Sequence, residues 1–181
     1  MMKILNVNIL RQPYLFLLAV LLTVTPTWAQ TCNSAIIPTA SDSRYQDHGD
    51  GAVTDLQTGL MWQRCSLGQS GTGCTTGTAT RFAWDLALQQ GENINTGGGF
   101  AGYSDWRLPN KKELESLVEE GCYSPAINNT NFPNTSNTAF WSSSPDSRHS
   151  DSAFAVHFRD GYSTYYSRSS SYQVRLVRGG L

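Results

Sequence analysis

The sequence predicts an α+β domain with two helices, several short strands and a strand-rich C-terminal third. Charged residues make up 15 % of the 181 residues and aromatic residues 11 %, which is typical of a packed globular domain. Two stretches have helical periodicity, and apolar residues alternate with polar ones near the C-terminus. The composition and the net charge of −1 exclude a coiled coil, a collagen and a strongly basic nucleic-acid-binding protein.

The first 29 residues are predicted to be a signal peptide. Lys3 and Arg11 precede an apolar run over 14–24, and Thr27-Trp28-Ala29 places small residues at positions −3 and −1 of a cleavage site. An uncleaved membrane anchor and a lipoprotein acylated at Cys32 are the alternatives. The remaining chain has a net charge of −3 and is expected in the periplasm, at the cell surface or in the medium, without a membrane span and without nucleic acid as a partner.

Four cysteines lie in the predicted mature chain. An even number of cysteines in an exported protein indicates two disulfides. We favour Cys65–Cys74, which closes a loop rich in Gly and Thr, and Cys32–Cys122, which ties the N-terminus to the end of a helix. A zinc site is the alternative, although the sequence lacks a Cys-x-x-Cys pair.

The first half of the mature chain is predicted to hold an arm, two strands and a helix. Residues 30–46 have no clear period and form the arm, and the domain proper is expected over 47–181. Short strands are expected at 53–55 and 60–64. A helix is expected over 80–90, with Trp84, Ala87 and Leu88 on its buried stripe and Gly97-Gly98-Gly99 beyond its end.

A second helix has a sharper predicted start. Asn110 is a suitable N-cap, and Glu113 three residues later completes a capping-box pattern. Leu114, Leu117 and Val118 supply its apolar face, and Gly121 suits its C-terminal end.

The C-terminal third is predicted to be mostly strands and polar loops. Residues 125–138 are rich in Asn, Thr and Pro and read as a long surface loop, followed by a strand over 139–143. In the strand over 154–158, Phe154, Val156 and Phe158 are expected to be buried and His157 to face solvent. Asp160-Gly161 indicates a hairpin, and the last strand is expected over 174–178.

Four segments carry a resemblance to a known family. They are GAVTDLQTGLMWQRC at 51–65, GYSDWRLPNKKELESLV at 102–118, FWSSSP at 140–145 and VRLVRGG at 174–180. Together they resemble the Lcl C-terminal domain, a bacterial family also called DUF1566, and the Trp-Arg-Leu-Pro stretch is similar to the formylglycine-generating-enzyme branch of the C-type-lectin-like fold. The resemblance implies two helices packed on a twisted, mostly antiparallel sheet with long polar loops. It also implies an adhesin, for which acidic or sulfated polysaccharides are the ligand class.

Several conspicuous residues have a scaffold interpretation. Trp106 and Leu108 are expected to be buried, with Arg107 paired to a carboxylate or to carbonyl groups. Asp47, Asp50 and Asp55 lack the spacing of an EF-hand and are read as turn formers, so no metal is expected.

Sequence signatures of catalysis are absent. The chain lacks Gly-x-Ser-x-Gly, His-Glu-x-x-His and a P-loop lysine, and it has no cysteine after Cys122 for an oxidase of the formylglycine-generating type. We therefore expect neither an enzyme nor a cofactor. A purely structural envelope module remains an alternative to a binding protein.

The segment 142–172 contains 11 Ser and 4 Tyr with interspersed Arg, a composition similar to that of antibody loops. It resembles the products of a diversity-generating retroelement, in which Asn codons become Ser, Tyr, Asp, His, Arg, Phe, Ala or Gly codons. The hypothesis is a variable binding face over 146–172 on a fixed scaffold; a fixed polar sheet face is the alternative. The extracellular ligand would be a protein or a glycan. The candidate ligand-binding residues are Trp141, Arg148, His149, Asp151, His157, Arg159, Tyr162, Tyr165, Tyr166, Arg168 and Tyr172.

Overall fold

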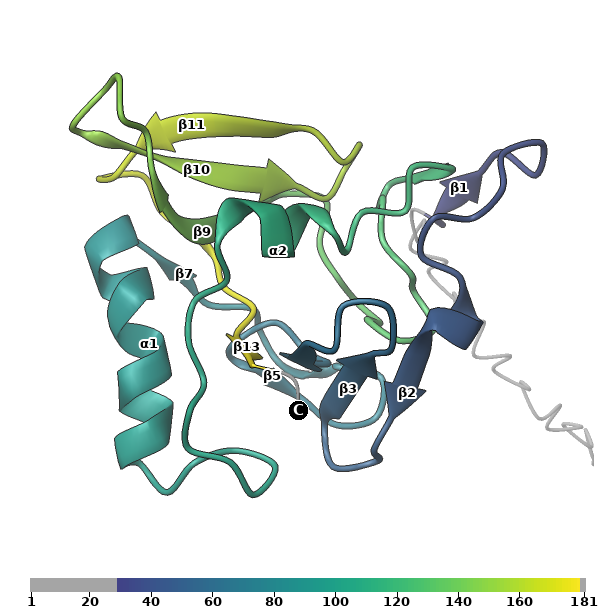
Figure 1. The fold of residues 1–181 in the computed structure, drawn as a ribbon, viewed down its shortest axis with the longest axis horizontal. Helices are drawn as coiled ribbons and strands as arrows, with labels where there is room; N and C mark the ends of the chain where they lie inside the picture. Colours follow the sequence, from purple (N-terminus) through teal and green to yellow (C-terminus); the bar gives the residue numbers. More distant parts are fainter. Residues whose placement is uncertain (1–28, 180–181) are drawn as a thin grey trace, which may run out of the picture.

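A computed structural model describes residues 29–179, and the predicted signal peptide therefore lies almost entirely outside the described residues. Two sheets organise the fold (Figure 1). The larger one has the order β11-β10-β9-β12-β7, with bounds Ser163–Ser167, Ser152–His157, Ala139–Pro145, Tyr172–Gln173 and Arg81–Phe82. The second has the order β13-β4-β3-β2, with bounds Val177–Arg178, Met61–Gln63, Ala52–Asp55 and Tyr45–Asp47.

The remaining elements are small sheets, two helices and one helical turn. The pairs are β1 (Thr31–Cys32) with β8 (Cys122–Tyr123) and β5 (Gln69–Ser70) with β6 (Thr76–Gly77). The helices are α1 (Trp84–Thr96) and α2 (Lys111–Glu115), and η1 (Asp42–Arg44) is a 3-10 turn. Every strand pair is antiparallel except β12–β9, so the predicted α+β class with two helices is confirmed.

The five-stranded sheet is buried on both faces at its centre. Along β10, Ala153 and Ala155 belong to one apolar cluster, which contains Trp84 of α1, whereas Val156 belongs to a second, which contains Leu114 of α2. The predicted alternation over 154–158 is therefore wrong in part, because Ala155 is buried as completely as Val156 and Phe154 is only half-buried. A strand covered on both faces loses the alternating pattern that marks a strand with one wet face.

Helix α1 begins and ends later than predicted. Arg81–Phe82 is a strand that pairs with β12, so the helix starts at Trp84 and continues to Thr96. Leu88, expected in the buried stripe, is exposed, and Gly91 is buried in its place. A Cβ atom on Gly91 would lie 2.5 Å from the Trp106 carbonyl oxygen, so glycine allows the helix to pack directly on that backbone.

Helix α2 has the predicted capping box. The Asn110 side chain accepts a hydrogen bond from the Glu113 amide at 3.0 Å, and Glu113 accepts one from the Asn110 amide at 2.8 Å. Glu113 is also the expected carboxylate partner of Arg107, with 2.7 Å between Arg107 Nη2 and Glu113 Oε1. The helix ends at Glu115, well before the predicted stop at Gly121, while Leu117 beyond it is still fully buried.

Two C-terminal predictions are corrected. The segment 125–138 lies outside regular strands and helices as expected, but it is not a surface loop, because Ala126, Ile127 and Phe132 are fully buried. The expected strand over 174–178 is interrupted: β12 ends at Gln173 and only Val177–Arg178 pairs with β4. Val174 and Leu176, between these strands, are core residues.

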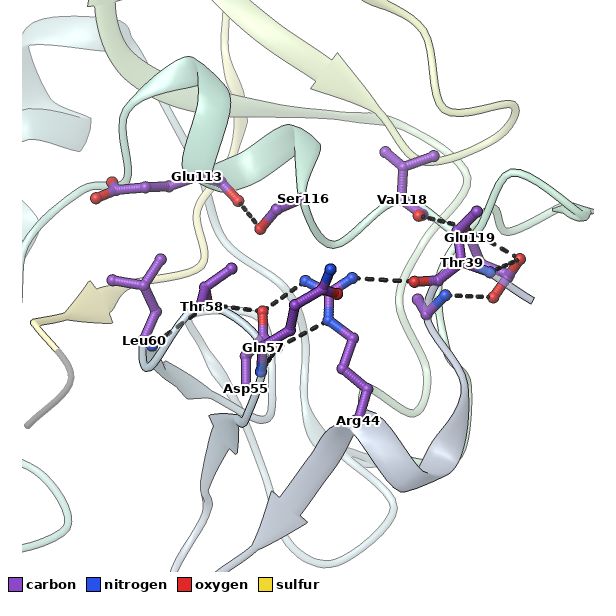
Figure 2. Close-up of polar contacts among 11 residues, drawn as sticks. Thr39, Arg44, Asp55, Gln57, Thr58, Leu60, Glu113, Ser116, Val118 and Glu119 are labelled. Carbon is purple, nitrogen blue, oxygen red and sulfur yellow. Dashed lines mark hydrogen bonds and ion pairs between the residues drawn. The ribbon is translucent and has the colours of Figure 1, made fainter. Parts of the chain in front are cut away.

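The N-terminal segment is tied to the core by polar contacts (Figure 2). Arg44 pairs with the fully buried Asp55 through bonds of 2.8 and 2.5 Å, and Glu119 accepts hydrogen bonds from the backbone amides of Thr39 and Ala40. Ala40 and Tyr45 join the apolar cluster that contains Leu114. Two residues of the predicted arm, Ala40 and Tyr45, thus contribute directly to the packed core.

Both predicted disulfides are present, Cys32–Cys122 and Cys65–Cys74, and they use all four cysteines. Disulfides persist in oxidising compartments and indicate an extracytoplasmic location. Within residues 29–179, no helix is long and apolar enough to cross a membrane.

Candidate binding surface

The candidate residues from the sequence gather around the β10–β11 hairpin but divide between its two faces. Side chains alternate along β11, so Tyr165 points to one face while Tyr162 and Tyr166 point to the other. Ser163, on the Tyr165 side, donates to Glu115 of α2 at 2.6 Å. Tyr166 packs against the cluster that contains Trp84 of α1. We call these the α2 face and the α1 face.

On the α2 face, Arg148, His149 and Tyr165 come together; we call them the Tyr165 cluster. The His149 ring stacks on the Tyr165 ring with centroids 4.7 Å apart and planes 18° apart. The Arg148 guanidinium lies 5.6 Å from the same ring centroid. All three side chains are exposed, and Tyr165 has a relative exposure of 40 %. They form an amphipathic patch that offers ring surface and hydrogen-bonding groups together.

Asp146 holds the loop that carries this cluster, although sequence reasoning missed it. Its buried carboxylate accepts from His149 Nδ1 at 2.8 Å and from the Arg148 amide and Nε at 3.1 and 3.3 Å. The bond with His149 is the main cause that lowers the pKa of Asp146 to about 2. Asp146 directly follows the FWSSSP motif, and this position between scaffold and polar tail is the only sequence signal for its role.

Two further residues extend the α2 face. The half-buried Phe154 lies opposite Tyr165 in the strand register, with its ring edge toward Tyr165 at a centroid distance of 6.4 Å. The Lys111 ammonium lies 4.4 Å from the Phe154 ring centroid and also pairs with Glu115 at 3.4 Å. Both contacts depend on where α2 meets β10, which the sequence pattern alone does not reveal.

On the α1 face, four aromatic side chains form a continuous row that we call the Tyr162 cluster: His157, Tyr162, Tyr166 and Tyr172. His157 stacks on Tyr162 at 5.2 Å, the Tyr162 and Tyr166 hydroxyls are 3.1 Å apart, and Tyr166 meets Tyr172 at 4.7 Å. Burial is the main cause that lowers the pKa of His157 and raises the pKa of Tyr166. His157 is half-buried under Tyr162, so it faces solvent only in part.

Trp141 and Arg168 do not present free surfaces. Trp141 has no exposed area; it packs edge-on against Tyr172 at 5.0 Å and donates to the Phe82 carbonyl at 2.8 Å. Trp141, one of the candidate ligand-binding residues, is therefore a core residue. Arg168 is half-buried, and its guanidinium lies 4.3 Å from the Trp84 ring centroid.

Most cations near the hairpin already have acidic neighbours. Arg148 pairs with Asp146, and the exposed Arg159 pairs with Asp160 at 3.6 Å. Asp151, exposed in the loop, bonds to the Ser152 hydroxyl and accepts the Arg168 amide on its carbonyl. The surface is thus polar and aromatic with largely compensated charge.

The aspartates considered as calcium ligands have structural roles. Asp47 and Asp50 accept amides of Gly49 and Ala52 in the β2–β3 turn, and Asp55 is the buried partner of Arg44. Among residues 29–179, no cluster of three or more His, Cys, Asp or Glu side chains is placed to hold a metal ion.

The fold and its disulfides define an extracytoplasmic α+β domain whose Ser-, Tyr- and Arg-rich hairpin is displayed on a packed scaffold. Residues 51–178 match the family model of the Lcl C-terminal domain, and the chain belongs to this family. The match confirms the family predicted from the four sequence segments. No curated protein sequence matches the chain significantly.

Proposed function

We propose that this domain is an exported, non-catalytic binding protein that contacts an extracellular partner through the Tyr165 cluster. The observation that carries the proposal is the stacking of His149 on the exposed Tyr165 ring, with the Arg148 guanidinium near the same ring and Asp146 bonded to both His149 and Arg148. Aromatic and Arg side chains with restricted rotamers lose little conformational entropy on binding and often dominate interfaces.

The charge distribution favours a protein surface over an acidic polysaccharide. A sulfated glycan needs uncompensated cations, but Arg148, Arg159 and Lys111 each pair with a carboxylate. A fixed site for acidic glycans is the second candidate, supported by family resemblance rather than by this charge pattern. A structural envelope module is the third.

An array of purified extracellular proteins and of neutral and sulfated glycans tests the proposal. Residues 30–181 should bind to one or more of the arrayed proteins. The variant Arg148→Ala/Tyr165→Ala should bind the same protein with at least tenfold lower affinity, as expected for two interface anchors. Tyr123→Ala, which removes an exposed tyrosine from β8, is the matched control and should bind as wild type does. Binding only to sulfated glycans would favour the second candidate, and equal binding by all variants would overturn the role of the Tyr165 cluster.

The exposure pattern also supports a variable hairpin on a fixed scaffold. Every exposed residue within 146–172 is Ser, Tyr, Arg, His or Asp, all of which are products of altered Asn codons. The fully buried Val156 and Phe158 of the same segment belong to the core. Changes restricted to the codons of exposed residues would alter which ligand is bound without disturbing the packing.

Sequencing of the DNA downstream of this gene tests the diversification. We expect a near-copy of the codons for 141–178 that differs only where the copy has adenine, next to a reverse transcriptase gene. The differing codons should be those of exposed residues. Absence of the copy would leave a fixed binding surface.

A further inference from the structure

A cavity is lined in part by the β2–β3 turn. This turn lies at the opposite end of the molecule from the β10–β11 hairpin (Figure 1). The cavity has a volume of about 560 Å³ and lies between the β2–β3 turn, the loop closed by Cys65–Cys74 and the residues around the end of α1. Volumes of this size are usual for small-molecule sites. The residues that matter for its chemistry are Asp47, Asp50, Gln63, Arg64, Ser66 and Gln69.

One side of the cavity is apolar. Leu67, Ile94 and Phe100 line it, and all three are partly buried against the apolar cluster that contains Trp84. The turn residue Gly51 has a φ of +94°, and a Cβ atom there would lie 2.9 Å from the tip of the Phe100 ring. Glycine at this position therefore lets the Phe100 ring reach the cavity wall.

The charges on the wall are mostly compensated. Asp47 pairs with Arg64 at 2.9 Å, and Arg64 also donates to the Thr130 carbonyl at 3.1 Å. Asp50 accepts the Ala52 amide at 2.9 Å through one oxygen. Among the lining residues, all of which lie in the described part of the chain, Arg64 is the one strong cation, so an anion would find no spare positive charge.

The polar wall nevertheless has unused hydrogen-bonding capacity. Within residues 29–179, seven buried side-chain nitrogen or oxygen atoms lack a partner, and four of them belong to this wall. They are Gln63 Oε1, Arg64 Nε, Ser66 Oγ and Gln69 Oε1. Buried polar atoms without partners are costly and uncommon, so their concentration beside one cavity points to a ligand.

We propose that this cavity binds a neutral polyol about the size of one sugar ring. Hydroxyl groups both donate and accept, which matches a wall of two amide oxygens, one hydroxyl and one guanidinium N–H. The C–H face of a sugar ring matches the Phe100 side, and compensated charges disfavour anions. Because all four unpartnered atoms are covered in the free protein, binding includes a reorientation of the side chains that carry them, a change common on ligand binding.

Titration of ¹⁵N-labelled residues 30–181 with a panel of neutral monosaccharides and myo-inositol, followed by NMR, tests the proposal. Saturable shifts should appear in the amides of 49–51, 63–72 and 94–100, and not in those of 147–167. Inorganic sulfate serves as the anionic comparison. Shifts confined to the hairpin, larger cavity shifts with sulfate, or no shifts with any neutral probe at millimolar concentration would overturn it.

Two variants sharpen the test. Gln69→Ala removes one amide and should weaken binding up to about tenfold, the range expected for one hydrogen bond. Thr72→Trp, at an exposed lining position, should fill the cavity and abolish binding while the remaining amide spectrum stays folded. Gln57→Ala, an exposed glutamine outside the cavity, is the control. Wild-type affinity in both cavity variants would contradict the assignment, whatever the partner of the Tyr165 cluster.

Discussion

Asp55 on β3 is one of the residues that hold the N-terminal segment, through its ion pair with Arg44. Burial acts to raise the pKa of its carboxyl, but hydrogen bonds from Arg44, Thr58 and the Gln57 amide outweigh burial and lower the pKa below its usual value. A carboxyl whose pKa is lowered by folding stabilises the protein above its unfolded pKa of about 3.9. This contribution is lost as the pH falls through the lower folded value.

Asp55→Asn should therefore lower the free energy of unfolding by about 3 kcal/mol at neutral pH, because it leaves the Arg44 charge without its partner. Urea denaturation between pH 7 and pH 2 measures the effect. The difference between wild type and variant should shrink as the pH falls below about 4. A difference that is constant with pH, or absent at pH 7, would contradict this role.

Arg175 is a fully buried arginine held by neutral groups. It donates to the backbone carbonyls of Gln63 and Arg64 and to the Thr135 hydroxyl, and its guanidinium lies 4.9 Å from the Phe132 ring centroid. Burial lowers the pKa of this guanidinium. Its planar fork serves several acceptors at once, which an ammonium group does not reproduce.

Arg175→Lys should lower the free energy of unfolding by about 2 kcal/mol or more, because at least one buried acceptor loses its donor. Chemical denaturation monitored by tryptophan fluorescence checks this. Arg148→Lys, at an exposed arginine, should change stability by less than about 0.5 kcal/mol. Equal stability of Arg175→Lys and wild type would show that the guanidinium fork is dispensable.

Helix α1 depends on a glycine for its packing. An Ala in place of Gly within an exposed helix usually stabilises by about 1 kcal/mol. At Gly91 we expect the reverse, because the added Cβ would lie 2.5 Å from the Trp106 carbonyl oxygen and 2.9 Å from the Arg107 Cα. Thermal unfolding should show a lower midpoint for Gly91→Ala and an unchanged or higher one for Gln89→Ala, on the exposed side. A higher midpoint for Gly91→Ala would mean that α1 can move away from the Trp106–Arg107 backbone without loss of stability.

Local elements were predictable from sequence, whereas the candidate binding surface was predictable only in part. The capping box of α2 uses residues three positions apart, and the Asp160-Gly161 turn fixes the hairpin by local geometry. Burial of Trp141 depends on contacts with Phe82 and Tyr172, far away in sequence. To predict how the tyrosines divide between the two faces, one needs the register of β10 with β11. To predict the role of Asp146, one needs the conformation of its loop.

At the scale of the whole molecule, the two disulfides should differ in their effect. Cys32–Cys122 closes a separation of 90 residues and Cys65–Cys74 one of 9. Loop-closure entropy gives about 4.6 kcal/mol for the first and about 2.7 kcal/mol for the second. Urea denaturation of the two double Ser variants should show the larger loss for Cys32→Ser/Cys122→Ser. The opposite order would mean that the N-terminal segment does not restrict the unfolded chain.

The molecule as a whole places a fixed, disulfide-linked scaffold beneath an exposed aromatic hairpin. Two apolar clusters enclose the centre of the five-stranded sheet, and the exposed hairpin positions lie outside both clusters. This separation of core from surface is what a binding domain with replaceable contacts requires.

The most direct test of this account is site-specific photo-cross-linking in the native cell. A photoreactive phenylalanine replaces Tyr165 in one variant and Tyr123, the exposed tyrosine of β8, in another. We predict a covalent adduct of higher mass from position 165 and none from position 123. Adducts from position 123 alone, equal adducts from both, or none from position 165 would contradict a binding role for the Tyr165 cluster.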